Sequence, residues 1–199
     1  MRERPILFSA PMVRAVLAGT KTQTRRVVKG RGWEPHHLAH HRLVQHDDPR
    51  AGLQAYFRGD DAGDWLGIGC PYGQPGDRLW VREAWAKTQP LGLPWPQTMI
   101  VYREGDNRTD YGGPWKPSIH MPRAASRITL EITGVRVERL QDISRGDAMA
   151  EGCPFPNMAD GDDPRRWYAD LWDQINGAGA WDKNPWVWVV EFRRTLSPT

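Results

Sequence analysis

The feature that most constrains the fold is the longest strand pattern in the chain, at residues 126–139. Apolar side chains recur on both sides of a glycine, at Ile128, Leu130, Ile132, Val135 and Val137. Alternation with a period of two is typical of a strand with one buried face. Gly134 shifts the alternation by one position, which predicts a bulge or a bend around the corner of a barrel.

Short strands and a few helices make up the rest of the chain. We expect further strands at 5–8, 22–28, 41–46, 53–58, 78–82, 99–102 and 186–192, with a hairpin turn at 47–52. Helical patterns occur at 10–17, 144–151 and 164–175. The last strand is apolar on both faces, so it is expected to be central. Since no run of βαβ units occurs, we predict an α+β fold, a small mixed β-barrel with flanking helices.

The composition fits one globular domain over residues 1–199. Hydrophobic residues make up 39% of the chain and charged residues 26%, and the formal net charge is +3. This mild positive charge permits an anionic ligand without requiring one. Two cysteines, no long apolar run and no signal-peptide pattern at the start predict a reduced, cytoplasmic protein without a membrane segment. Eleven Trp suit a core, a base-stacking pocket or an interface.

The densest polar stretch is AGTKTQTRR at residues 18–26. Gly19 is expected to end the preceding helix in a left-handed conformation. Thr22, Thr24 and Arg26 share one face if the chain is then extended, and Lys21 is expected to lie in the turn before the strand. An amine, hydroxyls and guanidiniums beside a flexible glycine suit a polar or anionic ligand, whereas a solvated basic strand after a helix end needs none.

Two other stretches carry candidate pocket residues. Arg82, Glu83 and Trp85 follow a predicted strand, and they fit either a pocket wall or a surface ion pair beside a packed Trp. Lys116 and His120 fall on one side of an extended segment at 115–123, where two prolines are expected to prevent a helix. They fit contacts to a base or phosphate, and equally a rigid loop with an incidental His.

A loop-rich insert at about 30–76 contains a cluster of histidines: His36, His37, His40, His41 and His46. Spacings of three and four suit a metal site on a helix. Pro35 and the predicted hairpin disrupt such a helix, and no Cys or carboxylate sits at matching spacing. We therefore predict a polar surface loop, no metal and no cofactor.

Several of these segments resemble the ASCH domain family. The similarity rests on residues 18–26, on GDRL at 76–79, on AMAEG at 148–152 and on the closing aromatic strand, and it extends from about Ile6 to Phe192. Residues 71–77 and 115–127 resemble the longer bacterial and prophage form of the domain. The resemblance implies a PUA-like fold, a small β-barrel with flanking helices and a cleft for nucleic acid or a nucleoside.

The resemblance also implies an activity and three catalytic residues. A small bacterial member of the family hydrolyses the acetyl amide of 4-acetylcytidine with a Lys, a Thr and a Glu, which fall on Lys21, Thr24 and Glu151 here. Thr24 is then the expected nucleophile, and Lys21 its base once burial or nearby arginines lower its pKa. Glu151 is expected to orient Lys21 or to pass a proton to the leaving nitrogen.

Three functions stay open at this point. The first is an amidohydrolase acting on an N4-acylated cytidine or a similar modified nucleoside, with Arg26, Arg82, Glu83, Trp85, Lys116 and His120 as candidate substrate-binding residues. The second is a binding module for RNA or a modified nucleotide without catalysis. The third is a metal-independent ribonuclease that uses Lys21 and His120. The expected partner is a modified nucleoside or RNA, and the oligomeric state stays open.

Overall fold

The central element of the computed structural model is a five-stranded mixed sheet in the order β1-β6-β9-β10-β2. The structure describes residues 1–29, 42–44, 54–58, 65–88, 99–105, 114–155 and 163–195. The strands are β1 (Glu3–Leu7), β6 (Arg78–Arg82), β9 (Thr129–Arg139), β10 (Trp186–Thr195) and β2 (Gln23–Val27). β1 and β6 are parallel and the other neighbours antiparallel, which makes the fold α+β, as expected.

β1 and β2 are the two edges of this sheet, and helix α1 (Ala10–Leu17) joins them. No strand pairing closes the sheet into a barrel within the described residues. A side chain bridges the two edges instead, because Arg26 Nη2 donates to the Leu7 carbonyl at 3.0 Å. The edges therefore approach each other where α1 crosses between them.

The predicted bulge in the long strand is confirmed. Between Glu191 and Phe192 of β10 the partner on β9 changes from Gly134 to Ile132, so Thr133 is the extra residue. Gly134 has a second reason to be glycine, since a Cβ there would lie 2.7 Å from Glu191 Oε2.

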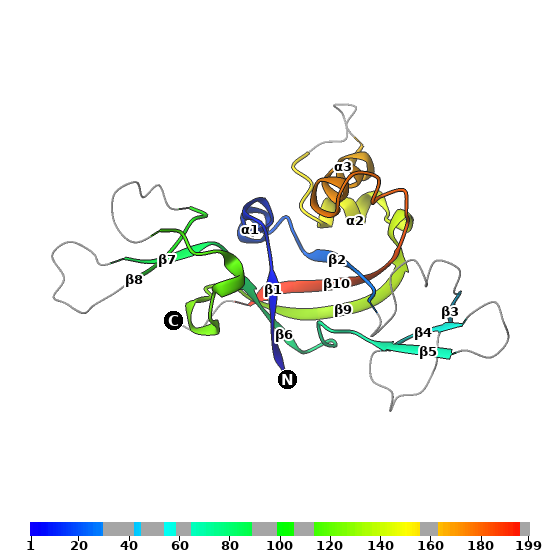
Figure 1. The fold of residues 1–199 in the computed structure, drawn as a ribbon, viewed down its shortest axis with the longest axis horizontal. Helices are drawn as coiled ribbons and strands as arrows, with labels where there is room; N and C mark the ends of the chain where they lie inside the picture. The colour runs from blue at the N-terminus through cyan, green and yellow to red at the C-terminus, as the bar shows by residue number, and fades with distance from the viewer. Residues whose placement is uncertain are drawn as a thin grey trace.

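Two smaller sheets flank the main one, at opposite ends in Figure 1. The first has the order β3 (Arg42–Val44), β4 (Gln54–Arg58) and β5 (Trp65–Gly69), and its β3–β4 pair confirms the predicted hairpin. The rings of Phe57 and Trp186 lie 5.6 Å apart and link this sheet to the main core. The second pairs β7 (Trp85–Thr88) with β8 (Met99–Tyr102).

The α-helices pack against both faces of strand β10. α2 (Arg145–Ala150) and α3 (Pro164–Asn176) bury Val187 and Val189 of β10 in one hydrophobic cluster. Trp188, Val190 and Phe192 belong to a second cluster with α1 and β6. Both faces of β10 are therefore covered, which confirms its predicted central position. No described helix has the length and apolar character needed to span a membrane.

Three short 3₁₀ helices complete the described elements: η2 (Ser118–His120), η3 (Arg123–Ala125) and η4 (Leu140–Asp142). η2 corrects the prediction of a fully extended segment at 115–123. Its turn is closed by the His120 N–H, which donates to the Pro117 carbonyl at 3.0 Å. A proline lacks only the N–H, so Pro117 can accept at the start of a single helical turn.

Candidate functional site

The segment after α1 folds as the sequence predicts. Gly19 has a φ of 76°, and the N–H groups of Thr20 and Lys21 both donate to the Ala15 carbonyl, at 2.9 and 3.1 Å. Lys21 therefore lies in the turn before β2. Its backbone forms an isolated β-bridge with Glu151, which brings the first polar stretch beside the end of α2.

Glu151 is held by the geometry at the two ends of α2. The helix begins at a capping box, because the Ser144 hydroxyl accepts from the Asp147 N–H at 3.0 Å and the Asp147 carboxylate accepts from the Ser144 N–H. The helix ends at Ala150, and Gly152 follows shortly after it with a φ of 96°. A Cβ at Gly152 would lie 2.8 Å from the Ala15 Cβ, so the glycine permits α1 and the end of α2 to meet.

The side chains of Lys21 and Glu151 form a buried ion pair. Lys21 Nζ donates to Glu151 Oε2 at 2.5 Å and to the Glu151 carbonyl at 3.0 Å. The two side chains are 0% and 2% exposed. Burial lowers the pKa of Lys21, although the negative charge of Glu151 acts in the opposite direction. The sequence patterns alone did not predict a contact between Lys21 and Glu151. Only the family resemblance implied that contact.

Arg25 is a member of this cluster that the sequence analysis did not assign to the site. Its guanidinium is buried and lies 3.2 Å from Glu151, 2.7 Å from Glu138 and 3.5 Å from Asp147. The alternation of β2 places Arg25 on the opposite face from Thr24 and Arg26. That alternation was a usable signal, but Glu138 is 113 residues away along the chain and no short-range pattern connects the two.

Thr24 lies on the other face of β2, where its hydroxyl accepts from Arg26 Nη1 at 2.9 Å. Thr24 is fully buried, and no hydrogen bond joins it to Lys21 within the described structure. Phe8 is a neighbour of both basic groups, since Lys21 Nζ and the Arg26 guanidinium each lie 5.7 Å from the centroid of its ring. Arg26 thus contacts the predicted nucleophile and the ring beside the predicted base.

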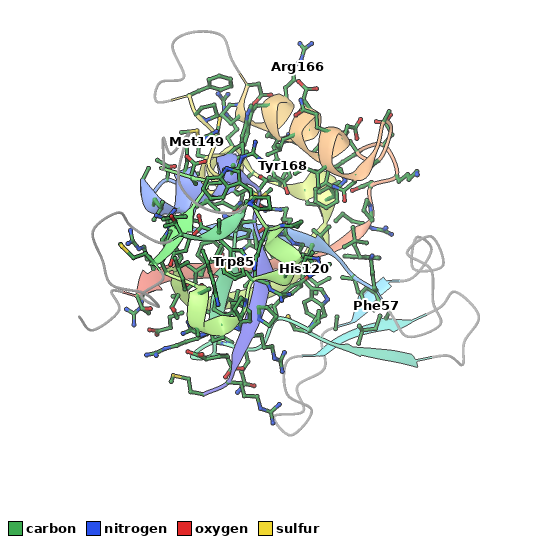
Figure 2. The ribbon with its side chains drawn as sticks, turned by 60° about the vertical axis from the view of Figure 1, so that its left-hand side comes forward. Phe57, Trp85, His120, Met149, Arg166 and Tyr168 are labelled. Atoms are coloured by element: carbon green, nitrogen blue, oxygen red, sulfur yellow. The ribbon has the colours of Figure 1, made fainter. Side chains whose placement is uncertain are left out.

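A cleft of about 360 Å³ opens over this cluster between β1, β2 and α3. Arg25, Arg26 and Glu151 line it, together with the aromatic side chains of Tyr168 and Trp172. Figure 2 shows Tyr168 on the side of α3 turned toward the sheet, whereas Arg166 points away. The Tyr168 hydroxyl donates to Glu151 Oε1 at 3.4 Å, and burial together with the Glu151 charge raises the pKa of this tyrosine. Lys21 and Thr24 do not line the cleft.

A second cavity, of about 380 Å³, also borders on Glu151. Its wall comes from α1, from the residues that follow α2, and from Trp167 and Leu171 of α3. The two cavities share four lining residues: Ser9, Met12, Glu151 and Leu171. Glu151 is therefore at the junction of two hollows rather than at the bottom of one.

The other predicted pocket residues lie elsewhere. Glu83 is buried and accepts from Arg127 at 2.9 Å, while Arg82 donates to the Met121 carbonyl at 3.0 Å. Trp85 is buried beneath the Lys116 ammonium, which lies 5.0 Å from its ring centroid.

His120 is exposed, in the short helix η2. Neither cavity described above is lined by Arg82, Glu83, Trp85, Lys116 or His120, whereas Arg26 lines the first. Their neighbour Ser118 also lines the first cavity, so the segment at 115–123 reaches the cleft through a different residue.

No group of three His, Cys, Asp or Glu side chains arranged to hold a metal occurs in the described ranges. The five histidines of the predicted insert lie outside those ranges.

Comparison of the chain with protein-family models, with curated proteins and with solved structures gives no match in any of the three. The ASCH resemblance therefore stays a prediction from the motifs.

Proposed function

We propose that this chain is a hydrolase with an ASCH-type, PUA-like fold that cleaves the acyl amide of an N4-acylated cytidine or a similar modified nucleoside. The observation that carries the proposal is the buried pair of Lys21 and Glu151, in which Glu151 lines both cavities. Removing both charges from water is costly and seldom improves stability over apolar side chains. Buried ionisable groups with a displaced pKa at a cleft are typical of catalytic sites.

The proposed chemistry uses Thr24 as the nucleophile and Lys21 as the base and then the acid, while Glu151 orients the Lys21 amine. The Thr24 hydroxyl attacks the acyl carbon and transfers its proton to the neutral amine of Lys21. The bond from the acyl carbon to N4 then breaks, and N4 takes that proton from Lys21, which releases cytidine. Water hydrolyses the acyl-threonine to a carboxylate and restores the hydroxyl. The burial that lowers the Lys21 pKa supports its role as base.

Arg26 is proposed to stabilise the oxyanion, and the aromatic side chains that line the cleft are proposed to stack on the base. Arg26 lines the cleft and donates to the Thr24 hydroxyl at 2.9 Å, so the same guanidinium favours an ionised Thr24 and can donate to the developing oxyanion. Tyr168 and Trp172 offer ring surfaces for stacking a base. Proton transfer requires Lys21 and Thr24 to come within hydrogen-bond reach when substrate binds.

The burial of Thr24 favours one second candidate. A cleft whose expected nucleophile is fully buried and does not line it suits a module that binds a modified nucleoside or RNA without cleaving it. A ribonuclease using His120 has less support, because His120 lines neither cavity.

The test is chromatography of N4-acetylcytidine after incubation with the purified protein. We expect cytidine from the intact chain and none from Thr24→Val or Lys21→Met. The matched control is Thr22→Val, which makes the same change two residues away on an exposed side chain and should keep full turnover. Valine and methionine preserve side-chain volume, and Arg25 still pairs with Glu151 when Lys21 is replaced.

Thermal unfolding of each variant accompanies the assay, because lost turnover is informative only in a folded protein. Lys21→Ala is avoided, since it would open a cavity in addition to breaking the buried ion pair. Full turnover in folded Thr24→Val would reject the proposed nucleophile. An intact protein that binds N4-acetylcytidine without cleaving it would favour the binding module.

A further inference from the structure

The carboxylate of Glu151 has a different cation on each of its oxygens. Lys21 Nζ donates to Oε2 at 2.5 Å, whereas Arg25 Nη1 donates to Oε1 at 3.2 Å. The Tyr168 hydroxyl also donates to Oε1, at 3.4 Å. The side chains of Lys21 and Arg25 are both 0% exposed. Two buried positive charges therefore share one buried carboxylate.

Arg25 is held in place by partners other than Glu151. Its Nε and Nη2 atoms donate to Glu138 Oε1 at 3.1 and 2.7 Å, and Nη1 donates to the side-chain oxygen of Gln23 at 2.8 Å. Nη2 also lies 3.5 Å from the Asp147 carboxylate. Contacts with β9 and with α2 therefore fix the guanidinium beside Glu151 independently of the lysine.

The second cation matters because the proposed reaction requires Lys21 to be neutral. A buried carboxylate that loses its counter-ion is costly, since an unpaired charge is left away from water. With Lys21 as its sole cation, Glu151 would keep the amine protonated. A guanidinium stays protonated in proteins, so Arg25 compensates the charge of Glu151 both before and after Lys21 gives up its proton.

We propose, on the basis of the hydrolase function proposed above, that Arg25 is a positioning residue, which holds Glu151 and remains its counter-ion so that Lys21 can act as a neutral base. Arg25 transfers no proton, and the reaction is the one already described. Arg26 also disfavours the ammonium form of Lys21, but it does so from the side chain that contacts Thr24.

Arg136 of β9 supplies a matched control. It pairs with two of the carboxylates that Arg25 contacts, Glu138 and Asp147. Its third partner is Glu191 of β10, not the carboxylate of the buried pair. Arg136→Met therefore removes a cation from the same network of charges without removing one from the proposed base.

The test measures the pKa of the Lys21 amine by NMR titration of protein labelled with carbon-13 in its lysine side chains. The Lys21 signal is identified by its absence from Lys21→Met. In the intact chain this pKa is expected below its ordinary value. Arg25→Met should raise the pKa, Arg25→Lys should raise it less because a positive charge is kept, and Arg136→Met should leave it unchanged.

The pH profile of turnover gives a second readout. In Arg25→Met, kcat/KM for N4-acetylcytidine should fall about tenfold at neutral pH and recover as the pH rises and Lys21 becomes neutral. A loss that is the same at every pH would show a merely structural role. Thermal unfolding accompanies each variant, and Arg25→Gln replaces Arg25→Met if the latter does not fold, because glutamine can still donate to the neighbouring carboxylates.

The outcomes separate this inference from the proposed function. An unchanged Lys21 pKa in the uncharged Arg25 variant, or an equal rise in Arg136→Met, would overturn the role of Arg25 even if N4-acetylcytidine is cleaved. A Lys21 pKa at or above its ordinary value in the intact chain would overturn it without any variant. A rise confined to substitutions of Arg25 supports the role even if no compound is cleaved, in which case the hydrolase proposal alone fails.

Discussion

At the scale of single residues, the state of the Lys21 amine is set by two opposing influences. Burial disfavours the ammonium form and lowers its pKa, whereas the Glu151 carboxylate, 2.5 Å away, favours that form. The Arg25 and Arg26 guanidiniums act in the same direction as burial. Burial therefore extends the pH range in which the Lys21 amine is neutral, and the Glu151 charge raises the lower limit of that range.

Glu151→Gln should move the pH dependence of the reaction. Lys21 is neutral above its pKa, so kcat/KM is expected to rise as the pH rises through that value. Removing the carboxylate removes the influence that raises the Lys21 pKa, and the rising limb of the profile should move to lower pH. The measurement is kcat/KM for N4-acetylcytidine from about pH 5 to about pH 10.

The control for that profile is Glu191→Gln, a carboxylate on β10 that pairs with Arg136 and does not contact Lys21. Its profile should match that of the intact chain. If the rising limb of the kcat/KM profile stays in place in Glu151→Gln, or moves to higher pH, the assignment of Lys21 as the base is contradicted.

At the scale of elements, the site depends on the close meeting of α1 with the end of α2. Gly152 has a φ of 96°, and a Cβ there would lie 2.8 Å from the Ala15 Cβ and 3.3 Å from the Lys21 Cβ. Gly177, after α3, has a similar φ of 100° but nothing within 4 Å of its added Cβ. A comparison of Gly152 with Gly177 therefore separates the free-energy cost of backbone strain from the cost of a steric contact.

Gly152→Ala should therefore destabilise the protein more than Gly177→Ala does. Backbone strain alone is expected to lower the free energy of unfolding by about 2 kcal/mol at either position. The contact at Gly152 adds about 2 kcal/mol, because Ala15 and Lys21 must move. Urea denaturation measures both values, and equal losses would show that α1 does not press on the end of α2.

How far the sequence predicts this architecture depends on whether an element is determined locally. α1 and β8 occur at the predicted residues, and the helix predicted at 144–151 forms as α2 behind the local capping box of Ser144 and Asp147. β5 was missed because Gly67 and Gly69 weaken a strand pattern, and its pairing with β4 decides its conformation. The turn at Lys21 was predicted, but the partners of Arg25 come from distant segments that no local pattern connects.

At the scale of the whole molecule, a network of charges joins the elements around the site. Arg25 of β2 contacts Glu138 and Asp147, and Arg136 of β9 contacts the same two carboxylates. Gln23 donates to Asp147 at 2.8 Å. The network thus connects the edge strand β2 with β9 and with the first turn of α2, which carries Glu151 at its end.

Asp147 makes this network sensitive to acid. Burial alone would raise the pKa of Asp147, but hydrogen bonds from Gln23 and Ser144, together with the Arg25 charge, lower it to about 2. A carboxyl group with a pKa depressed by folding contributes stability above its unfolded pKa, and that contribution is lost as the pH falls through the folded value. The sensitive window is therefore from about pH 4 down to about pH 2.

Asp147→Asn should remove that part of the acid response. The contribution of Asp147 at neutral pH is about 1 kcal/mol after allowance for solvent screening of its partly exposed carboxylate. Urea unfolding at pH 7 and at pH 2.5 should show the variant losing about 1 kcal/mol less than the intact chain between the two conditions. Asp170→Asn, which changes an exposed carboxylate of α3, is the control and should keep the full loss. If Asp147→Asn and Asp170→Asn lose the same stability between the two pH values, the contacts of Asp147 do not stabilise the packing of β2 against α2. Glu151 is then held mainly by Lys21 and Arg25.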